Sequence, residues 1–198
     1  LFNFKDGGIL KDNQTNLFKS HIKKILKSKI DLVITSGAVS AGKFDFVPSV
    51  INNFQLSYYF KSVAIRPGKP ILFAKIKGKP KAVFGLPGNP ISSAACFRFF
   101  VYPYLRSLLG IKEEIPLKAI LRNGFRKKKD FTRFVKSKLS TTSNGKLEVK
   151  ILKGQESFRI KSFIQSNIWV MLPSGKDKFK KGETVDCFFP NQPNKIFF

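Results

Sequence analysis

A short apolar run that stops abruptly in small residues sets the first constraint on this fold. Leu32-Val33-Ile34 is followed at once by Thr35-Ser36-Gly37, with Gly42 a few residues later. An apolar run this short indicates a buried parallel strand. Open α/β sheets place their ligand crevices at the carboxyl ends of such strands. The small-residue loop is therefore either an ordinary strand-to-helix turn or one wall of a binding crevice.

The elements around this strand predict an α/β sheet. Thr15–Lys27 carries apolar residues at helical spacing and lysines on the opposite face, which is typical of an amphipathic helix. The helix leads into the strand, and such alternation indicates a parallel sheet. Further strands are predicted at Tyr58–Ile65, Ile71–Ile76 and Ala82–Phe84, and a second helix, kinked at Pro103, over Ile91–Leu109.

The rest of the chain predicts a small β-domain. From Ile115 onwards no long helical pattern recurs, and turn residues separate short β-rich segments. The predicted strands are Leu117–Leu121, Phe131–Leu139, Lys146–Ile151, Ile160–Ile164, Ile168–Leu172 and Thr184–Phe189. We therefore expect an α/β domain over residues 1–112 and a small all-β, barrel-like domain over residues 113–198.

The net charge of +25 raises the question of a polyanionic partner such as nucleic acid. The lysines are dispersed along the chain, however, and 22 phenylalanines point to a compositional bias. Dispersed charge favours the bias, although it would still attract small anions. No apolar run is long enough to span a membrane. Two well-separated cysteines, Cys96 and Cys187, indicate a reducing, cytoplasmic location.

Two further segments carry groups that suit an anionic ligand. Arg66-Pro67-Gly68-Lys69-Pro70 holds two cations in a proline-stiffened turn, and such a pair suits a phosphate or another oxyanion. A solvated basic turn is an equally good interpretation of that segment alone. Gly85-Leu86-Pro87-Gly88-Asn89-Pro90 precedes the second helix. Asn89 is placed as its N-cap and Pro90 as its first residue.

Three segments, in this order, resemble one family: T-S-G-A-V-S-A-G-K-F-D, A-I-R-P-G-K-P and G-L-P-G-N-P-I-S-S. They resemble the carboxyl-terminal half of molybdopterin molybdenumtransferases, the MoeA type whose relatives include gephyrin. The resemblance runs from about Asn3 to Pro190. It implies a three-layer, MogA-like molybdopterin-binding domain with a mostly parallel sheet, followed by a small β-barrel. It also implies that the chain begins inside a domain.

The resemblance implies a transferase of molybdenum cofactor biosynthesis. Such an enzyme inserts molybdate into adenylylated molybdopterin and releases AMP, with Mg²⁺ as cofactor, and the full-length protein would be a homodimer. Fixed cations would offset the repulsion between two anionic substrates. Two alternatives remain: a molybdopterin-binding module that does not catalyse, and, ranked third, a basic nucleic-acid-binding protein.

The resemblance also implies roles for individual residues. Catalytic roles fall on Asp12, Asp45, Arg66 and Lys69, with Asp45 also as the Mg²⁺ ligand. Substrate-binding roles fall on Thr35, Ser36, Gly37, Ser40, Gly42, Pro70, Pro87, Gly88, Asn89, Pro90, Arg133 and Ser157.

The chain departs from the family pattern at three of its positions. Ala38 replaces a usual glycine, Arg66 a usual lysine, and Glu156 the glycine of a common Gln-Gly-Ser. A carboxylate beside an oxyanion site opposes binding unless it points away. The Ala38 and Glu156 departures motivate the non-catalytic alternative.

Overall fold

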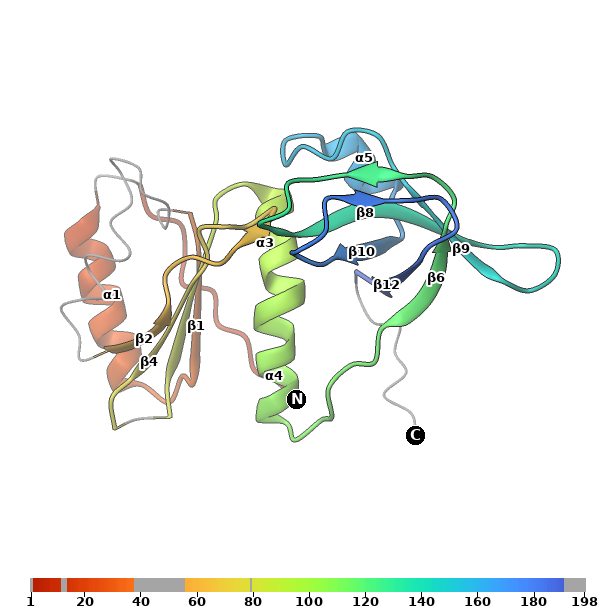
Figure 1. Ribbon diagram of the computed structural model, residues 1–198. Helices are drawn as coiled ribbons and strands as arrows, with labels where there is room; N and C mark the ends of the chain where they lie inside the picture. Colours follow the sequence, from red (N-terminus) through yellow and green to blue (C-terminus); the bar gives the residue numbers. More distant parts are fainter. Residues whose placement is uncertain (1, 12–13, 38–55, 79, 191–198) are drawn as a thin grey trace. The chain divides into compact units, whose positions relative to one another are not determined.

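The computed structural model describes residues 2–11, 14–37, 56–78 and 80–190 (Figure 1). They form two compact units. Unit 1 comprises Leu1–Ser62 and Pro70–Gly88, and unit 2 comprises Val63–Lys69 and Asn89–Phe198. The chain therefore passes between the units after Ser62, Lys69 and Gly88. The domain boundary expected near residue 112 stays a prediction.

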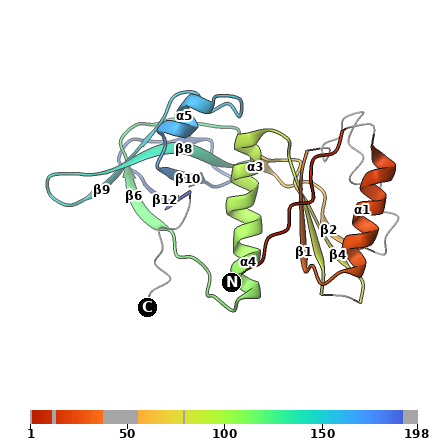
Figure 2. The same ribbon diagram turned by 180° about the vertical axis from the view of Figure 1, so that it is seen from behind.

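Unit 1 combines a sheet with helix α1, which lies along it (Figures 1 and 2). Helix α1 spans Thr15–Lys27, as predicted, and buries Phe18 and Ile22. Its lysines occupy the outer face, because an amphipathic helix packs through its apolar stripe. The described strands are β1 (Leu32–Ser36), β5 (Ala82–Leu86), β4 (Leu72–Ile76) and β2 (Leu56–Phe60), in that spatial order.

The predicted α/β class is confirmed, but the described sheet is mixed rather than mostly parallel. Strands β1 and β5 pair in parallel, whereas β4 runs antiparallel to both β5 and β2. Only residues 77–81 separate β4 from β5. A connection this short cannot make the crossover that a parallel pair requires.

Unit 2 contains the predicted barrel. Strand β8 (Thr132–Thr141) pairs with β9 (Leu147–Ile151) on one side and β10 (Ile168–Leu172) on the other. The ladder continues through β12 (Thr184–Phe188) and β6 (Leu117–Leu121) back to β9, which closes five strands. Strand β3 (Ile65–Arg66) adds to β8 in parallel. Strands β7 (Phe125–Arg126) and β11 (Lys178–Phe179) form a separate ribbon.

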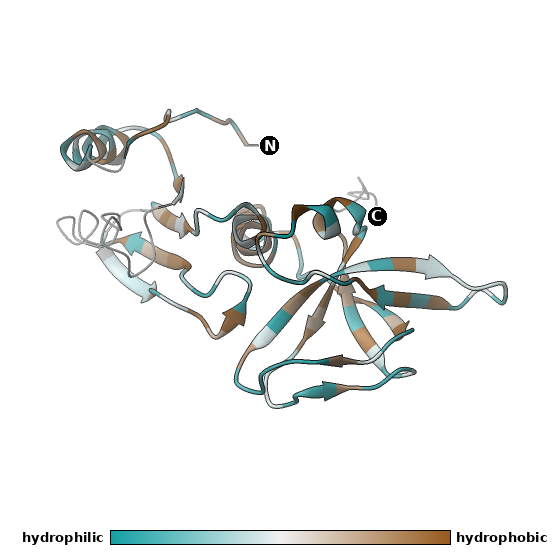
Figure 3. Cartoon of the chain, turned by 90° about the horizontal axis from the view of Figure 1, so that it is seen from above, coloured by the Kyte–Doolittle hydropathy of each residue, from teal (hydrophilic) through white to brown (hydrophobic). Residues whose placement is uncertain are grey.

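Alternating side chains fill the barrel. Val135, Val149, Ile168, Val170 and Leu172 are fully buried in its core. Apolar and polar residues alternate along the barrel strands in Figure 3, as expected for strands with one face in a core. Closure also pairs the strand edges, so the barrel avoids an exposed ladder.

Three predicted elements differ from those observed. The predicted strand Ile160–Ile164 is helix α5 (Ile160–Gln165), because apolar residues four apart follow a helical rather than an alternating period. The predicted strand Tyr58–Ile65 is two strands, β2 and β3, which pair in different units.

The predicted kinked helix is the third difference. It consists of α3 (Pro90–Cys96), a π-helical turn η1 (Phe97–Val101) and α4 (Tyr102–Leu108). Pro103 has no amide hydrogen to donate to the preceding turn, and the widened turn lies just before it. Among the described residues, no helix is long and apolar enough to cross a membrane.

A buried ion pair anchors this helix within unit 2. Arg98 is 4% exposed, and its Nη2 donates to both carboxylate oxygens of Glu114 at 2.6 Å. Its Nε donates to the carbonyl oxygen of Phe189 at 2.6 Å. The guanidinium therefore links the helix to the segments before β6 and after β12. A buried pair of this kind is costly to break, because the remaining charge stays desolvated.

We expect Arg98→Met to lower the free energy of unfolding by about 3–5 kcal/mol. Arg122→Met is the matched control, because Arg122 pairs with Glu148 at 3.4 Å but its side chain is 55% exposed. The control should cost less than about 1 kcal/mol. Urea denaturation of both variants checks this. Equal losses would show that burial does not decide the strength of the Arg98 pair.

Candidate functional site

Two of the predicted binding segments meet in unit 1 at the carboxyl ends of β1 and β5. The parallel register places Thr35 opposite Gly85 and Ser36 opposite Leu86. The amide of Gly37 donates to the carbonyl oxygen of Leu86 at 2.9 Å, and Ser36 Oγ donates to that of Pro87 at 3.3 Å. The T-S-G and G-L-P-G segments, about 50 residues apart, thus form one edge.

The backbones of these two segments approach closely. A Cβ on Gly88 would lie 3.4 Å from the Cα of Gly37, and Gly37 itself has φ +92°. Glycine is required at Gly37, because other residues rarely adopt that conformation. The two segments therefore lie backbone against backbone at this edge.

A cavity of about 480 Å³ opens beside this edge, between residues 5–10, helix α1 and strand β1. Its lining is Lys5, Asp6, Gly7, Gly8, Ile9, Leu10, Phe18, His21, Ile22, Ile25, Val33, Ile34, Thr35, Ser36 and Gly37. Apolar side chains of α1 and β1 line part of the cavity, and polar groups lie at Lys5, Asp6 and His21 and at the Thr35–Gly37 end. Small-molecule sites commonly combine such walls with a few fixed polar groups.

Thr35 is the informative polar group of this cavity. Its Oγ1 is buried and has no hydrogen-bond partner among the described residues. Buried hydroxyls are nearly always paired, because an unpaired one loses its bonds to water without replacement. A ligand in the cavity would supply the partner.

Unit 2 presents a cationic cluster that consists of Arg66, Lys69 and Arg133. Arg66 and Lys69 lie in a closed turn, in which the Val63 amide donates to the Lys69 carbonyl oxygen at 3.0 Å. The turn contains a cis Arg66–Pro67 bond and Gly68 at φ +103°. Because β3 pairs with β8, Arg66 lies directly opposite Arg133 in the ladder.

The cations of this cluster lie close enough to act on one another. Like charges directly opposite one another destabilise a strand pair. Burial lowers the pKa of Arg133, the charge of Arg66 lowers it further, and the Glu156 carboxylate partly opposes this. The Nε of Arg133 is buried without a hydrogen-bond partner among the described residues. The arrangement would be relieved by an oxyanion, which accepts from guanidinium groups.

Phe131 organises the cluster, although the sequence pattern does not mark it as a site residue. The Cζ of Arg66 lies 5.1 Å from the Phe131 ring centroid, and the Nζ of Lys69 lies 5.9 Å from it. The face of an aromatic ring attracts cations at such distances. One phenylalanine among 22 gives no signal by type. Its position two residues before Arg133 was the available clue.

The exposed position of Glu156 weakens the repulsion that its carboxylate would exert on a bound oxyanion. The Glu156 carboxylate lies 3.9 Å from the Nε of Arg159, and its side chain is 53% exposed. It acts on Arg133 through space, and solvent screens it. Ser157, the next residue, is half-buried in the same segment, and its role stays a prediction.

The remaining predicted site residues have varied outcomes. Asn89 Oδ1 accepts from the amides of Ile91 and Ser92, each at 3.2 Å, which confirms the predicted N-cap with Pro90 as first residue. Pro70 is half-buried just before β4, and Pro87 is buried.

Asp12, Ala38, Ser40, Gly42 and Asp45 lie outside the described residues. Within the described ranges, no group of three or more His, Cys, Asp or Glu residues could hold a metal.

Two family models match the chain. Residues 2–107 match a probable molybdopterin binding domain, and residues 118–188 match the MoeA C-terminal region (domain IV). Molybdopterin molybdenumtransferases of Staphylococcus aureus and Staphylococcus epidermidis are each 37% identical over 183 residues. The matched region is 90% of this chain and 43% of each relative.

Solved structures show the same likeness. A molybdopterin biosynthesis MoeA protein from Pyrococcus horikoshii matches with a TM-score of 0.69 and 29% identity, over 90% of this chain and 42% of that one. A molybdenum cofactor biosynthesis protein from Pyrococcus furiosus matches with a TM-score of 0.66 and 25% identity, over 91% and 56%.

The turn between Arg66 and Lys69 depends on Gly68. A Cβ there would lie 2.4 Å from the Sγ of Cys96. We expect Gly68→Ala to lower the free energy of unfolding by about 2–4 kcal/mol, from backbone strain plus overpacking. Adding Cys96→Ala should recover the overpacking part. Chemical denaturation measures both.

Gly175→Ala is the matched control. Gly175 has φ +85°, but nothing lies within 4 Å of a Cβ placed there. The control should therefore lose only about 1–2 kcal/mol of strain. Identical losses at the two glycines would show that Cys96 does not constrain the turn.

Proposed function

Because the chain belongs to the molybdopterin molybdenumtransferase (MoeA-type) family, matching its carboxyl-terminal half, we propose that it binds the substrates of molybdate insertion. The proposed reaction joins molybdate to adenylylated molybdopterin and releases AMP. The chain spans 43% of the length of its curated relatives. The complete transfer is therefore proposed for a protein of their length.

The observation that carries this proposal is the Arg66–Arg133 pair. Arg66 and Arg133 are register partners of β3 and β8, and Lys69 lies over the same Phe131 ring as Arg66. Three cations gathered in this way suit a small dianion. Molybdate would accept hydrogen bonds from these groups and neutralise their repulsion. Arg66, Lys69 and Arg133 thus bind and orient the oxyanion in this proposal.

The cavity of unit 1 is proposed to hold the pterin end of the second substrate. Its apolar walls suit a flat heterocycle, which would also give Thr35 Oγ1 the hydrogen-bond partner that it lacks among the described residues. The backbone at Ser36, Gly37, Pro87 and Gly88 would face the polar edge or the phosphate. Ser40, Gly42, Pro70, Asn89 and Pro90 keep their proposed substrate-binding roles.

Asp12 and Asp45 keep their proposed catalytic roles, in which their carboxylates position a cation. Mg²⁺ at Asp45 would supply charge neutralisation between the two anions. No step is derived through it, because both carboxylates lie outside the described residues. A homodimer and a cytoplasmic location are further proposals; the two buried free thiols, Cys96 and Cys187, suit a reducing compartment.

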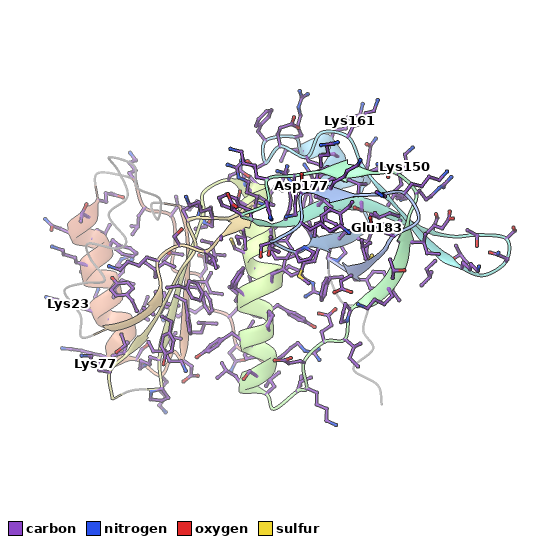
Figure 4. The ribbon with its side chains drawn as sticks, in the orientation of Figure 1. Lys23, Lys77, Lys150, Lys161, Asp177 and Glu183 are labelled. Atoms are coloured by element: carbon purple, nitrogen blue, oxygen red, sulfur yellow. The ribbon has the colours of Figure 1, made fainter. Side chains whose placement is uncertain are left out.

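Two alternative functions, a non-catalytic binding module and a nucleic-acid-binding protein, differ in the role that they give to the net positive charge of the chain. A non-catalytic module would bind the same substrates without transfer. A nucleic-acid-binding protein would need one continuous basic face. Lys23, Lys77, Lys150 and Lys161 instead point away from the ribbon on separate elements (Figure 4), and all four are exposed. This dispersal gives the nucleic-acid alternative little support.

We expect the chain to bind molybdate, and Lys69→Ala to weaken that binding by about 10–100-fold, because a charge-assisted contact is lost. Lys138→Ala is the control, since Lys138 is an exposed lysine of β8 outside the cluster. Calorimetric titration at two salt concentrations measures both, with an oligonucleotide as parallel titrant. Binding confined to the oligonucleotide would overturn the proposal.

Thr35→Val should separate binding from stability. Valine removes a buried hydroxyl that lacks a partner in the described structure, so we expect unfolding free energy to rise by up to about 1 kcal/mol. Binding of adenylylated molybdopterin should fall by about tenfold. Ser20→Ala is the control, because Ser20 is a half-buried residue of α1 that does not line the cavity. A less stable variant with unchanged pterin binding contradicts the role given to Thr35.

A further inference from the structure

Lys136, in strand β8, is the one lysine among the described residues whose side chain is fully buried. It is 1% exposed, which makes it one of the largest fully enclosed side chains of the molecule. A buried ammonium is expensive, because it loses its hydration. Such a residue is retained where its hydrogen bonds serve a purpose that an apolar side chain would not.

The ammonium of Lys136 is directed at one short segment. Its Nζ donates to the carbonyl oxygens of Gly154 at 2.7 Å, Glu156 at 3.0 Å and Arg159 at 3.3 Å. These contacts use all three of its donors. The segment that it holds, Gly154–Arg159, contains Ser157, to which the family resemblance gives a substrate-binding role.

Two neutral side chains, Gln155 and Ser162, also hold this segment in place by hydrogen bonds. Gln155 Oε1 accepts from the Lys136 amide at 2.9 Å, and Gln155 Nε2 donates to the Lys136 carbonyl oxygen at 2.8 Å. Ser162 Oγ lies 2.6 Å from the carbonyl oxygen of Gly154 and 2.9 Å from that of Arg159. The carbonyls of Gly154 and Arg159 are therefore shared between Lys136 and Ser162.

The same strand carries the oxyanion site. Arg133 lies three residues before Lys136 on β8. The Glu156 carboxylate acts on both cations, because it raises the pKa of Arg133 and of Lys136, while burial and the charge of Arg133 lower that of Lys136. A segment tied to Lys136 is thus held within electrostatic reach of Arg133.

We propose that Lys136 is a positioning residue that, with Ser162, fixes the Gly154–Arg159 segment so that Ser157 and Glu156 keep a defined place relative to Arg133. This inference rests on the proposed oxyanion site. Lys136 does not touch the oxyanion; it acts through backbone carbonyls, and its buried charge adds to the positive potential of the site. Loosening the segment lets Ser157 and the Glu156 carboxylate change position, which weakens anion binding.

The test compares four variants of the chain, with molybdate as probe. Lys136→Met removes the donors and the charge, whereas Lys136→Arg keeps both. Ser162→Ala loosens the same carbonyls with little change in volume. Asn167→Ala is the control, because Asn167 ties the far end of β8 by hydrogen bonds with the Leu139 amide at 2.7 Å and its carbonyl oxygen at 3.1 Å.

Two quantities are measured: the molybdate dissociation constant and hydrogen exchange of the amides in residues 154–159. Lys136→Met should weaken molybdate binding by about tenfold and accelerate exchange in that segment. Lys136→Arg should stay within about threefold of the unaltered chain, and Ser162→Ala should fall between them. Asn167→Ala should lower stability but leave both quantities unchanged. If the role of Lys136 were merely structural, Lys136→Met would likewise lower stability without changing the molybdate dissociation constant.

The outcomes separate the two proposals. If the unaltered chain binds no molybdate, the oxyanion site itself fails, and the role of Lys136 fails with it. If the unaltered chain binds and Lys136→Met binds equally well, only the positioning role is overturned. Should Lys136→Met not fold, Ser162→Ala decides: faster exchange in residues 154–159 with unchanged affinity overturns the inference.

Discussion

The backbone pairing of strand β8 is the interaction on which unit 2 depends. Its hydrogen bonds with β9 and β10 close the barrel, and β3 adds to it in parallel. That third pairing places Arg66 opposite Arg133 and keeps the Arg66–Lys69 turn beside Phe131. Further along β8, Lys136 lies on the strand face opposite the barrel-core residue Val135, and there it holds the Gly154–Arg159 segment. One strand therefore supports the closed core, the cationic cluster and the segment that carries Ser157.

Gathering the like charges of the cationic cluster costs free energy, and the fold alone does not explain why they are gathered. Arg66 and Arg133 are register partners, and Arg133 is half-buried with an Nε that has no hydrogen-bond partner among the described residues. In unit 1, Thr35 likewise keeps a buried hydroxyl without a partner among the described residues. Each group costs free energy in the unliganded molecule, and each would be satisfied by a polar or anionic ligand. Proteins commonly break local rules of this kind at functional sites, and both residues were assigned to substrate binding from sequence.

Most short-range patterns were predicted well from sequence, and the errors come from one misread local period and from long-range pairing. Helix α1, the Asn89 cap and most barrel strands were predicted, because they depend on residues close in the chain. Ile160–Ile164 was predicted as a strand but is helical. Tyr58–Ile65 was predicted as one strand but contributes to two sheets, and nothing in its residues marks the division. Phe131 and Lys136 escaped notice for a related reason: a phenylalanine or lysine in a strand acquires its role from what lies across the ladder.

The sequence by itself determined the α/β alternation, the barrel-like second half and the motifs that identify the family, since these depend on periodicity and on residue types at fixed spacing. Tertiary structure alone decided that the described sheet is mixed, that Arg66 lies opposite Arg133, and that the charge of Lys136 is buried beneath the Ser157 segment. The physical reason is that burial and cross-strand contact depend on which distant segments pair, whereas the sequence specifies directly only the preferences of neighbouring residues.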